Sequence, residues 1–125
     1  MITINSMNIH STTYIDLSYL HAVTGGDEAF EKTLLGSAIS DIDVNIQRLR
    51  ESWAQRDACQ VRSAAHTLKS VVVIAGLPHL ENACKLIDSR FRDGVFHEDC
   101  FPQMNHLINE WISARSKLKE LLQYY

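Results

Sequence analysis

Hydrophobic positions recur at steps of three and four along most of the chain, the spacing that places side chains on one face of an α-helix. The longest run, over residues 30–53, predicts one helix of about six or seven turns. Its apolar or small positions are Phe30, Leu34, Ala38, Ile42, Ile46, Leu49 and Trp53. A second long helix is predicted near the C-terminus, with its buried face formed by Met104, Leu107, Trp111, Ala114, Leu118, Leu121 and Tyr125.

The stretch 61–76 predicts a helix with two very different faces. At 100° per residue, one face is small and aliphatic and consists of Val61, Ala64, Leu68, Val71, Val72 and Ala75. The opposite face is formed by Arg62, His66, Lys69, Ser70 and Val73. We therefore expect an imidazole in solvent, flanked by cationic groups, on a helix anchored by its back. Such an arrangement suits a histidine that carries an anion.

Two shorter helices complete the pattern. Residues 15–23 predict a short amphipathic helix with apolar positions at Ile15, Leu20 and Val23. Helical spacing resumes after Pro78 and stops at Asp93-Gly94, with apolar positions at Leu80, Ala83, Cys84, Ile87 and Phe91. The β-branched run over 71–74 belongs to a longer helical pattern, so it does not predict a strand.

Residues that begin and end helices separate these segments. Asp27, Asp57 and Asp99 are predicted N-caps, because an aspartate can accept a hydrogen bond from a backbone N–H of the first turn. Gly76 suits the left-handed position that ends a helix, and Pro78 suits the first turn of the next helix. The short connections favour antiparallel neighbours. We predict an all-α fold, an antiparallel up-down four-helix bundle preceded by a short N-terminal helix.

The chain length of 125 residues fits one domain, which we expect over residues 14–125. Residues 1–13 are rich in Ser, Thr and Asn and are predicted to form a flexible lead-in. The 12 Lys and Arg residues are spread out and balanced by 15 Asp and Glu residues, so nucleic acid is not an expected partner. No apolar run approaches the roughly 20 residues of a membrane span.

Cysteine and histidine positions predict no disulfide framework and no metal site. Three cysteines at unrelated spacings are typical of a reducing, cytoplasmic setting. The spacing of His97, Cys100 and His106 fits no standard structural zinc pattern. Cys84 and the two tryptophans, Trp53 and Trp111, fall on apolar stripes and are expected in the core. No glycine-rich phosphate loop is present, so the chain is not expected to be an autonomous kinase.

One segment of the histidine helix resembles a family signature. The segment Ala65-His66-Thr67-Leu68-Lys69, with Gly76 ten residues after the histidine and Leu80 four residues further on, resembles the signature of histidine-containing phosphotransfer (HPt) domains. The segments 15–17 and 24–30 are similar to the opening helix and Gly-Asp turn of that family, and Asp57 fits its helix start. The resemblance covers about residues 14–122.

The resemblance implies roles for two residues of the histidine helix. His66 would accept the phosphoryl group and Lys69 would contact it. From their positions on the helix around His66, we expect four residues in the surface that docks a partner: Arg62, Ser70, Val73 and Ile74. For Val73 and Ile74, packing against a neighbouring helix is an equally good interpretation. Ser70 stands where the family commonly has glycine, so its side chain lies near the approach route of a partner.

The implied partners are receiver domains of response regulators and of a hybrid sensor histidine kinase. An aspartyl phosphate on the receiver would donate the phosphoryl group, and the receiver would supply Mg²⁺, so we expect no cofactor bound by this domain. We further expect a monomer without membrane contact of its own. The protein would be cytoplasmic, either free-standing or as the C-terminal module of a membrane-bound sensor kinase.

Two functions remain open at this point. The first is a phosphorelay intermediate. The second is a degenerate HPt-like helical adaptor that binds receiver domains without being phosphorylated. The presence of both His66 and Lys69 favours the first, since a degenerate copy need not keep them.

Overall fold

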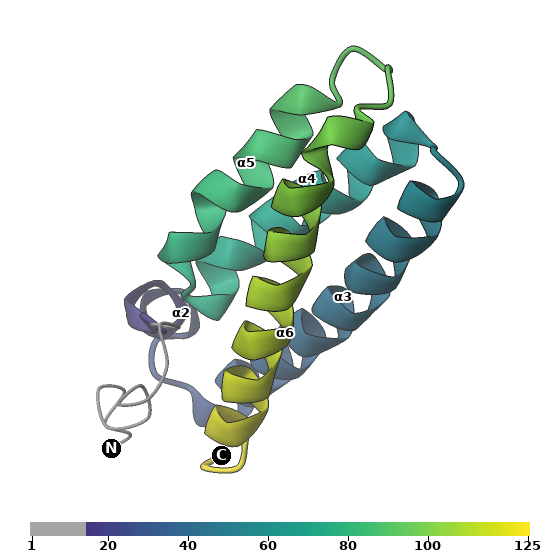
Figure 1. Cartoon of the computed structure of the whole chain (residues 1–125). Coiled ribbons are helices and arrows are strands. Elements are labelled where there is room, and N and C mark those ends of the chain that lie inside the picture. Colours follow the sequence, from purple (N-terminus) through teal and green to yellow (C-terminus); the bar gives the residue numbers. More distant parts are fainter. Residues whose placement is uncertain (1–14) are drawn as a thin grey trace.

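Four helices run up and down in an antiparallel bundle in the computed structural model, which describes residues 15–125 (Figure 1). They are α3 (Glu28–Ala54), α4 (Ala58–Ala75), α5 (Glu81–Arg90) and α6 (Phe101–Leu122). Short 3-10 turns, η1 (Pro78–Leu80) and η2 (Glu98–Cys100), precede α5 and α6. No strand occurs among the residues described. The predicted all-α fold is confirmed, whereas the predicted lead-in over 1–13 lies outside the described residues.

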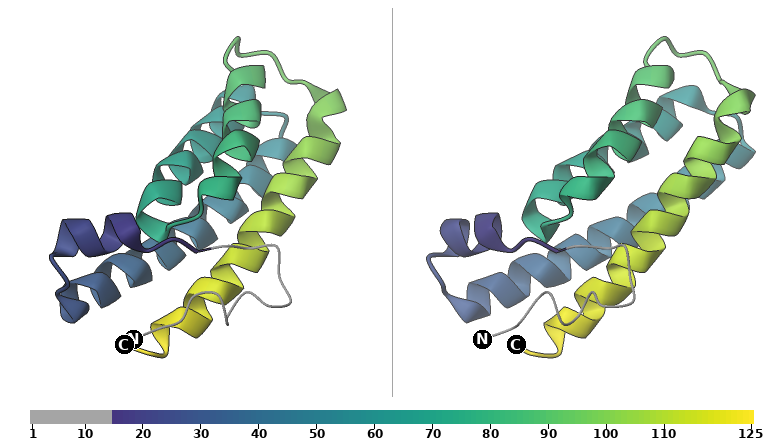
Figure 2. Two further views of the ribbon diagram at one scale, coloured as in Figure 1. Left: turned by 90° about the vertical axis from the view of Figure 1, so that its left-hand side faces the viewer. Right: turned by 60° about the vertical axis from the view of Figure 1, so that its left-hand side comes forward.

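A fifth helix, α2 (Ser18–Thr24), lies across the end of the bundle where α4 ends and α5 begins (Figure 2). It is shorter than the predicted helix over 15–23, because the Asp16 carboxylate accepts a hydrogen bond from the Ser18 backbone N–H (2.9 Å) and starts the helix there. Ile15 and Leu20 are buried as expected, but Val23 is exposed.

Two of the three predicted N-caps are confirmed. Asp27 accepts a hydrogen bond from Phe30 N and Asp57 accepts one from Gln60 N, each at 3.1 Å. The prediction for Asp99 is wrong, because α6 begins two residues later and Asp99 pairs with Arg90 instead. The cause is Pro102, which stands three residues after Asp99 and has no N–H for that carboxylate to accept a hydrogen bond from.

The buried face of α3 differs from the predicted stripe at its N-terminal end. Phe30 is 45% exposed, and Glu31 and Leu35 are buried in its place. The reason is geometric: each step of four residues drifts by about 40° around the helix axis. Positions counted back from Ala38 in steps of four, first Leu34 and then Phe30, therefore rotate away from the core.

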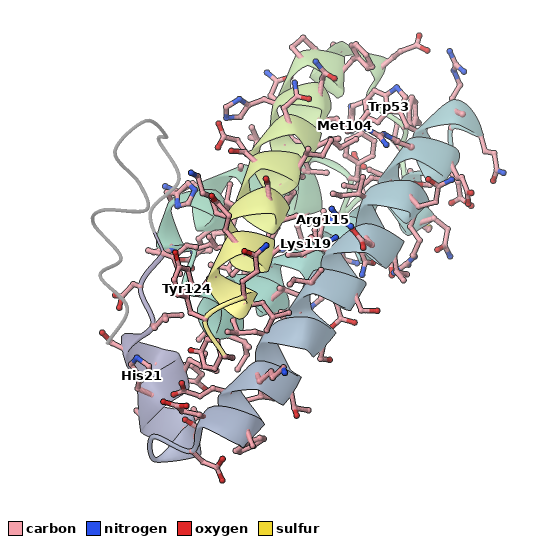
Figure 3. All side chains as sticks on the ribbon, turned by 90° about the horizontal axis from the view of Figure 1, so that it is seen from below. His21, Trp53, Met104, Arg115, Lys119 and Tyr124 are labelled. Atoms are coloured by element: carbon pink, nitrogen blue, oxygen red, sulfur yellow. The ribbon has the colours of Figure 1, made fainter. Side chains whose placement is uncertain are left out.

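The core contains the predicted stripes of the other helices. Cys84 and Trp111 are fully buried. Trp53 is partly buried at the far end of the bundle from His21 (Figure 3), where its ring packs against three phenylalanines, Phe91, Phe96 and Phe101. All three cysteines are free.

Gly76 ends α4 in the left-handed region, with φ 68°. Its carbonyl accepts a hydrogen bond from the Asp16 N–H at 2.7 Å, which attaches the segment before α2 to the end of α4. A Cβ atom on residue 76 would lie 2.0 Å from the Asp16 carbonyl oxygen. The contact between these two backbones therefore requires glycine.

Candidate functional site

α4 is held between α3 and α5, and this packing leaves one of its faces open. Its predicted inner residues are all buried, and so is Ala65. The His66 side chain points the other way and is 66% exposed. The ring is therefore accessible, while the buried aliphatic side chains fix the helix that carries it.

An aspartate from α5 reaches the His66 ring. Asp88 Oδ2 lies 3.1 Å from His66 Nδ1, and Asp88 Oδ1 accepts a hydrogen bond from Arg62 Nε at 3.0 Å. Asp88 is only 3% exposed. Burial opposes its ionisation, but the hydrogen bonds from His66 and Arg62 outweigh burial, so the pKa of Asp88 lies below its usual value. The carboxylate is therefore ionised at neutral pH.

This arrangement decides which nitrogen of His66 carries the proton. An ionised carboxylate can only accept hydrogen bonds, so Nδ1 must donate to Asp88. In the neutral imidazole the other nitrogen, Nε2, is then left with its lone pair. The ring thus presents its basic nitrogen from an exposed side chain.

Asp88 is the site residue that the sequence reasoning missed. A signal was present, because Asp88 follows Cys84 by one helical turn and Ile87 by one residue on a predicted apolar stripe. A carboxylate on the edge of a buried stripe needs a donor from a neighbouring helix. The sequence does not say which helix supplies it.

The other predicted site residues surround His66 on two sides. A shallow hollow between α4 and α5 is lined by His66, Lys69, Ser70, Val72, Val73 and Glu81. A second hollow, between α3 and α4, is lined by Leu34, Ser37, Ala38, Asp41, Ser70, Val71 and Ile74. Ser70 borders both hollows. Val73 is 50% exposed, whereas Ile74 is partly buried against the core.

The described residues hold neither a cluster of metal-binding side chains nor a helix that could cross a membrane. Over residues 15–125 no group of three His, Cys, Asp or Glu side chains could hold a metal ion. His97 lies near Asp93 and His106 lies near Glu110, while Cys100 is buried. None of the helices within that range is both long and apolar enough to cross a membrane.

The site lies within a segment of the chain that matches a known protein family. The family model of the Hpt domain matches residues 33–123, a span that includes His66, Lys69 and Asp88. The chain belongs to the Hpt domain family. Hpt domains are phosphocarriers rather than enzymes, so membership supports a role in histidine phosphotransfer.

Two solved Hpt structures share the fold. The HPT domain of a sensor hybrid histidine kinase from Shewanella has a TM-score of 0.76 at 17% identity, covering 89% of this chain and 95% of that one. Histidine-containing phosphotransfer protein B (HptB) from Pseudomonas aeruginosa PAO1 has a TM-score of 0.76 at 21% identity, covering 92% and 99%. No curated protein sequence matches this Hpt domain.

Proposed function

We propose that this Hpt domain is a phosphorelay intermediate in which His66 accepts a phosphoryl group from the aspartyl phosphate of one receiver domain and passes it to another. The observation that carries the proposal is the hydrogen bond between His66 Nδ1 and Asp88. It leaves Nε2 as the nucleophile on a ring that a second protein can reach.

The transfer step follows from this tautomer. The Nε2 lone pair attacks phosphorus, and the bond between phosphorus and the aspartyl oxygen breaks, with its electrons leaving on the receiver's carboxylate. His66 keeps its Nδ1 proton, so the ring gains positive charge, which the Asp88 carboxylate stabilises. Transfer of this kind is loose and in line, and it depends on positioning and on charge neutralisation. The same steps in reverse deliver the phosphoryl group to a second receiver.

The remaining roles divide between this domain and its partner. Lys69, which lines the same hollow as His66, would neutralise part of the phosphoryl charge. The receiver would contribute its acidic pocket and Mg²⁺. Ser70, Val73 and Ile74 would belong to the docking surface, as would the exposed part of Arg62. The domain would act as a monomer in the cytoplasm.

Phosphorylation of His66 can be tested with two donors, the small phosphoryl donor phosphoramidate and a phosphorylated receiver domain. We expect both to give an acid-labile phosphoryl group on the wild-type protein and none on His66→Gln. His106→Gln is the matched control, because His106 is also a helical histidine, with a side chain 65% exposed. Its labelling should equal that of the wild type.

Two outcomes would contradict the proposal. Label that persists in His66→Gln would assign the acceptor to another residue. A wild-type protein that binds receiver domains but takes no label from either donor would be the degenerate adaptor.

We predict that Lys69→Ala slows transfer from the receiver by about tenfold, the factor for losing one charge-assisted hydrogen bond of about 1.5 kcal/mol. The fold should be unchanged, because the Lys69 side chain is partly exposed. Single-turnover transfer rates and circular dichroism check both statements. Lys119→Ala is the control, because Lys119 is an exposed lysine of α6, away from the α4 helix (Figure 3). Equal rates for the two variants would exclude a role of Lys69 at the phosphoryl group.

A further inference from the structure

One buried carboxylate stands between two basic side chains of the same helix. Arg62 and His66 are one turn apart on α4, and each donates to a different oxygen of Asp88, at 3.0 and 3.1 Å. Asp88 is 3% exposed, whereas the Arg62 side chain is 42% exposed and that of His66 is 66% exposed. A buried carboxylate needs a cation close by. Either neighbour could supply the positive charge.

We propose that Arg62 is a positioning residue that supplies this positive charge, so that His66 can remain uncharged beside Asp88. The inference rests on the proposed phosphorylation of His66. It gives Arg62 a role within the domain, in addition to the docking role expected from the sequence.

Protonation decides whether the imidazole of His66 can attack phosphorus. A lone carboxylate in hydrogen-bond contact favours the protonated ring. In imidazolium both nitrogens carry a proton, so Nε2 has no lone pair and cannot attack phosphorus. Because guanidinium is positively charged at any pH at which the protein is folded, Arg62 already neutralises Asp88. The carboxylate then fixes the tautomer of His66 without forcing the ring to protonate.

The other charged groups around the ring do not replace Arg62. Lys69 and Glu81 line the hollow beside His66 and carry opposite charges. Lys85 pairs with Glu81 at 3.2 Å. Cys84 lies one turn before Asp88, and burial raises its thiol pKa to about 11, so it is uncharged at neutral pH. From α6, the buried residue near Cys84 is the uncharged Trp111.

Besides supplying charge, Arg62 orients the Asp88 carboxylate. The Nε–H of Arg62 holds Oδ1, which fixes the rotation of the carboxylate about its Cβ–Cγ bond and points Oδ2 toward the ring. Glutamine at position 62 could still donate a hydrogen bond, but it carries no charge. Lysine keeps the charge without the planar fork. The two substitutions therefore separate charge from shape.

The experiment measures the rate of His66 phosphorylation by phosphoramidate against pH in the wild type and in each variant. The donor ionises equally in all of them, so a difference between their midpoints reports on the protein. We expect Arg62→Gln to move the midpoint of the profile up by about one pH unit. Its rate should equal that of the wild type at high pH, where the ring is neutral in both. Arg62→Lys should restore most of the midpoint, and Arg50→Gln, an exposed arginine on α3, should not move it.

The double variant makes the test specific. Once Asp88→Asn has removed the negative charge, Arg62→Gln should shift the midpoint no further. A rate that falls by the same factor at every pH, or that falls equally in the Asp88→Asn background, would overturn the proposal and leave Arg62 as a docking or structural residue. An unchanged profile in Arg62→Gln would overturn it as well.

A separate readout distinguishes this inference from the proposed function. NMR titration of the His66 ring in the wild type, Arg62→Gln and Arg62→Lys follows ring protonation without any phosphoryl donor. If the wild type takes no phosphoryl group at any pH, the proposed function fails, while the titration still decides the role of Arg62. If Asp88→Asn does not fold, the titration of the wild type and the two Arg62 variants still decides the role of Arg62.

Discussion

Replacing Gly76 by alanine is expected to destabilise the protein by about 3 kcal/mol. The left-handed backbone at φ 68° costs an alanine about 1–2 kcal/mol. The added Cβ would lie 2.0 Å from the Asp16 carbonyl oxygen, so the two backbones must separate and lose the 2.7 Å hydrogen bond between Asp16 N–H and Gly76 O. Loss of that hydrogen bond lowers the free energy of unfolding by about a further 0.5–1.5 kcal/mol. Urea unfolding followed by circular dichroism measures the loss.

Gly25→Ala is the matched control for this prediction. Gly25 ends α2 with a similar φ of 63°, but a Cβ there would meet no atom within 4 Å. We expect a loss of about 1 kcal/mol, from backbone strain alone. Equal losses at the two glycines would mean that the contact between Gly76 and Asp16 contributes nothing.

A comparable loss, of about 3 kcal/mol, is expected when Glu31 is replaced by alanine. Glu31 is 3% exposed, and its carboxylate accepts hydrogen bonds from Thr24 Oγ1 (2.9 Å) and Tyr125 Oη (3.1 Å) and contacts His21 Nδ1. The carboxylate thus joins α2, α3 and the last residue of the chain. Alanine would remove the acceptor of the Tyr125 hydroxyl and the partner of His21, while Thr24 Oγ1 could still donate to Leu20 O at 2.9 Å. Thermal unfolding compares this variant with Glu28→Ala, an exposed glutamate in the same first turn of α3.

The contribution of Glu31 to the free energy of unfolding should also depend on pH. Burial tends to raise its pKa, but the hydrogen bonds from His21, Thr24 and Tyr125 outweigh burial, so the pKa of Glu31 lies below its ordinary value in the folded protein. A carboxylate with a lowered pKa stabilises the folded state above the pKa of the unfolded chain, about 4.3 for glutamate, and this contribution is lost as the pH falls through the folded value. The difference between the wild type and Glu31→Ala should therefore narrow as the pH falls below about 4. A difference that stays constant down to pH 3 or so would contradict this account.

The features that could be predicted from the sequence are those that depend on neighbours along the chain. Asp27 and Asp57 cap helices through a backbone N–H three residues away, so their roles could be read from local spacing. Gly76 was predicted to end α4 for the same reason. Its close approach to Asp16 could not be predicted, because it depends on how α2 packs across the end of the bundle.

The features that could not be predicted depend on the rotation of one helix against another. Glu31 is charged, and a pattern that counts apolar residues assigns the buried position to Phe30 instead. Asp88 faces α4 only because α5 is rotated to place it beside Arg62 and His66. Periodicity identifies the face of a helix to within about one residue, which is too coarse to pair a carboxylate with a particular imidazole nitrogen.

Asp88 lies 22 residues after His66 in the sequence and on another helix. The segment that carries the family signature therefore contains only part of the site. A peptide containing only α4 would carry Arg62, His66 and Lys69 and would lack the carboxylate at Nδ1. The histidine acquires its defined tautomer only when the hairpin of α4 and α5 has closed. The protonation pattern of this one ring is thus a property of tertiary structure, and it disappears on unfolding even though every residue of the signature is still present.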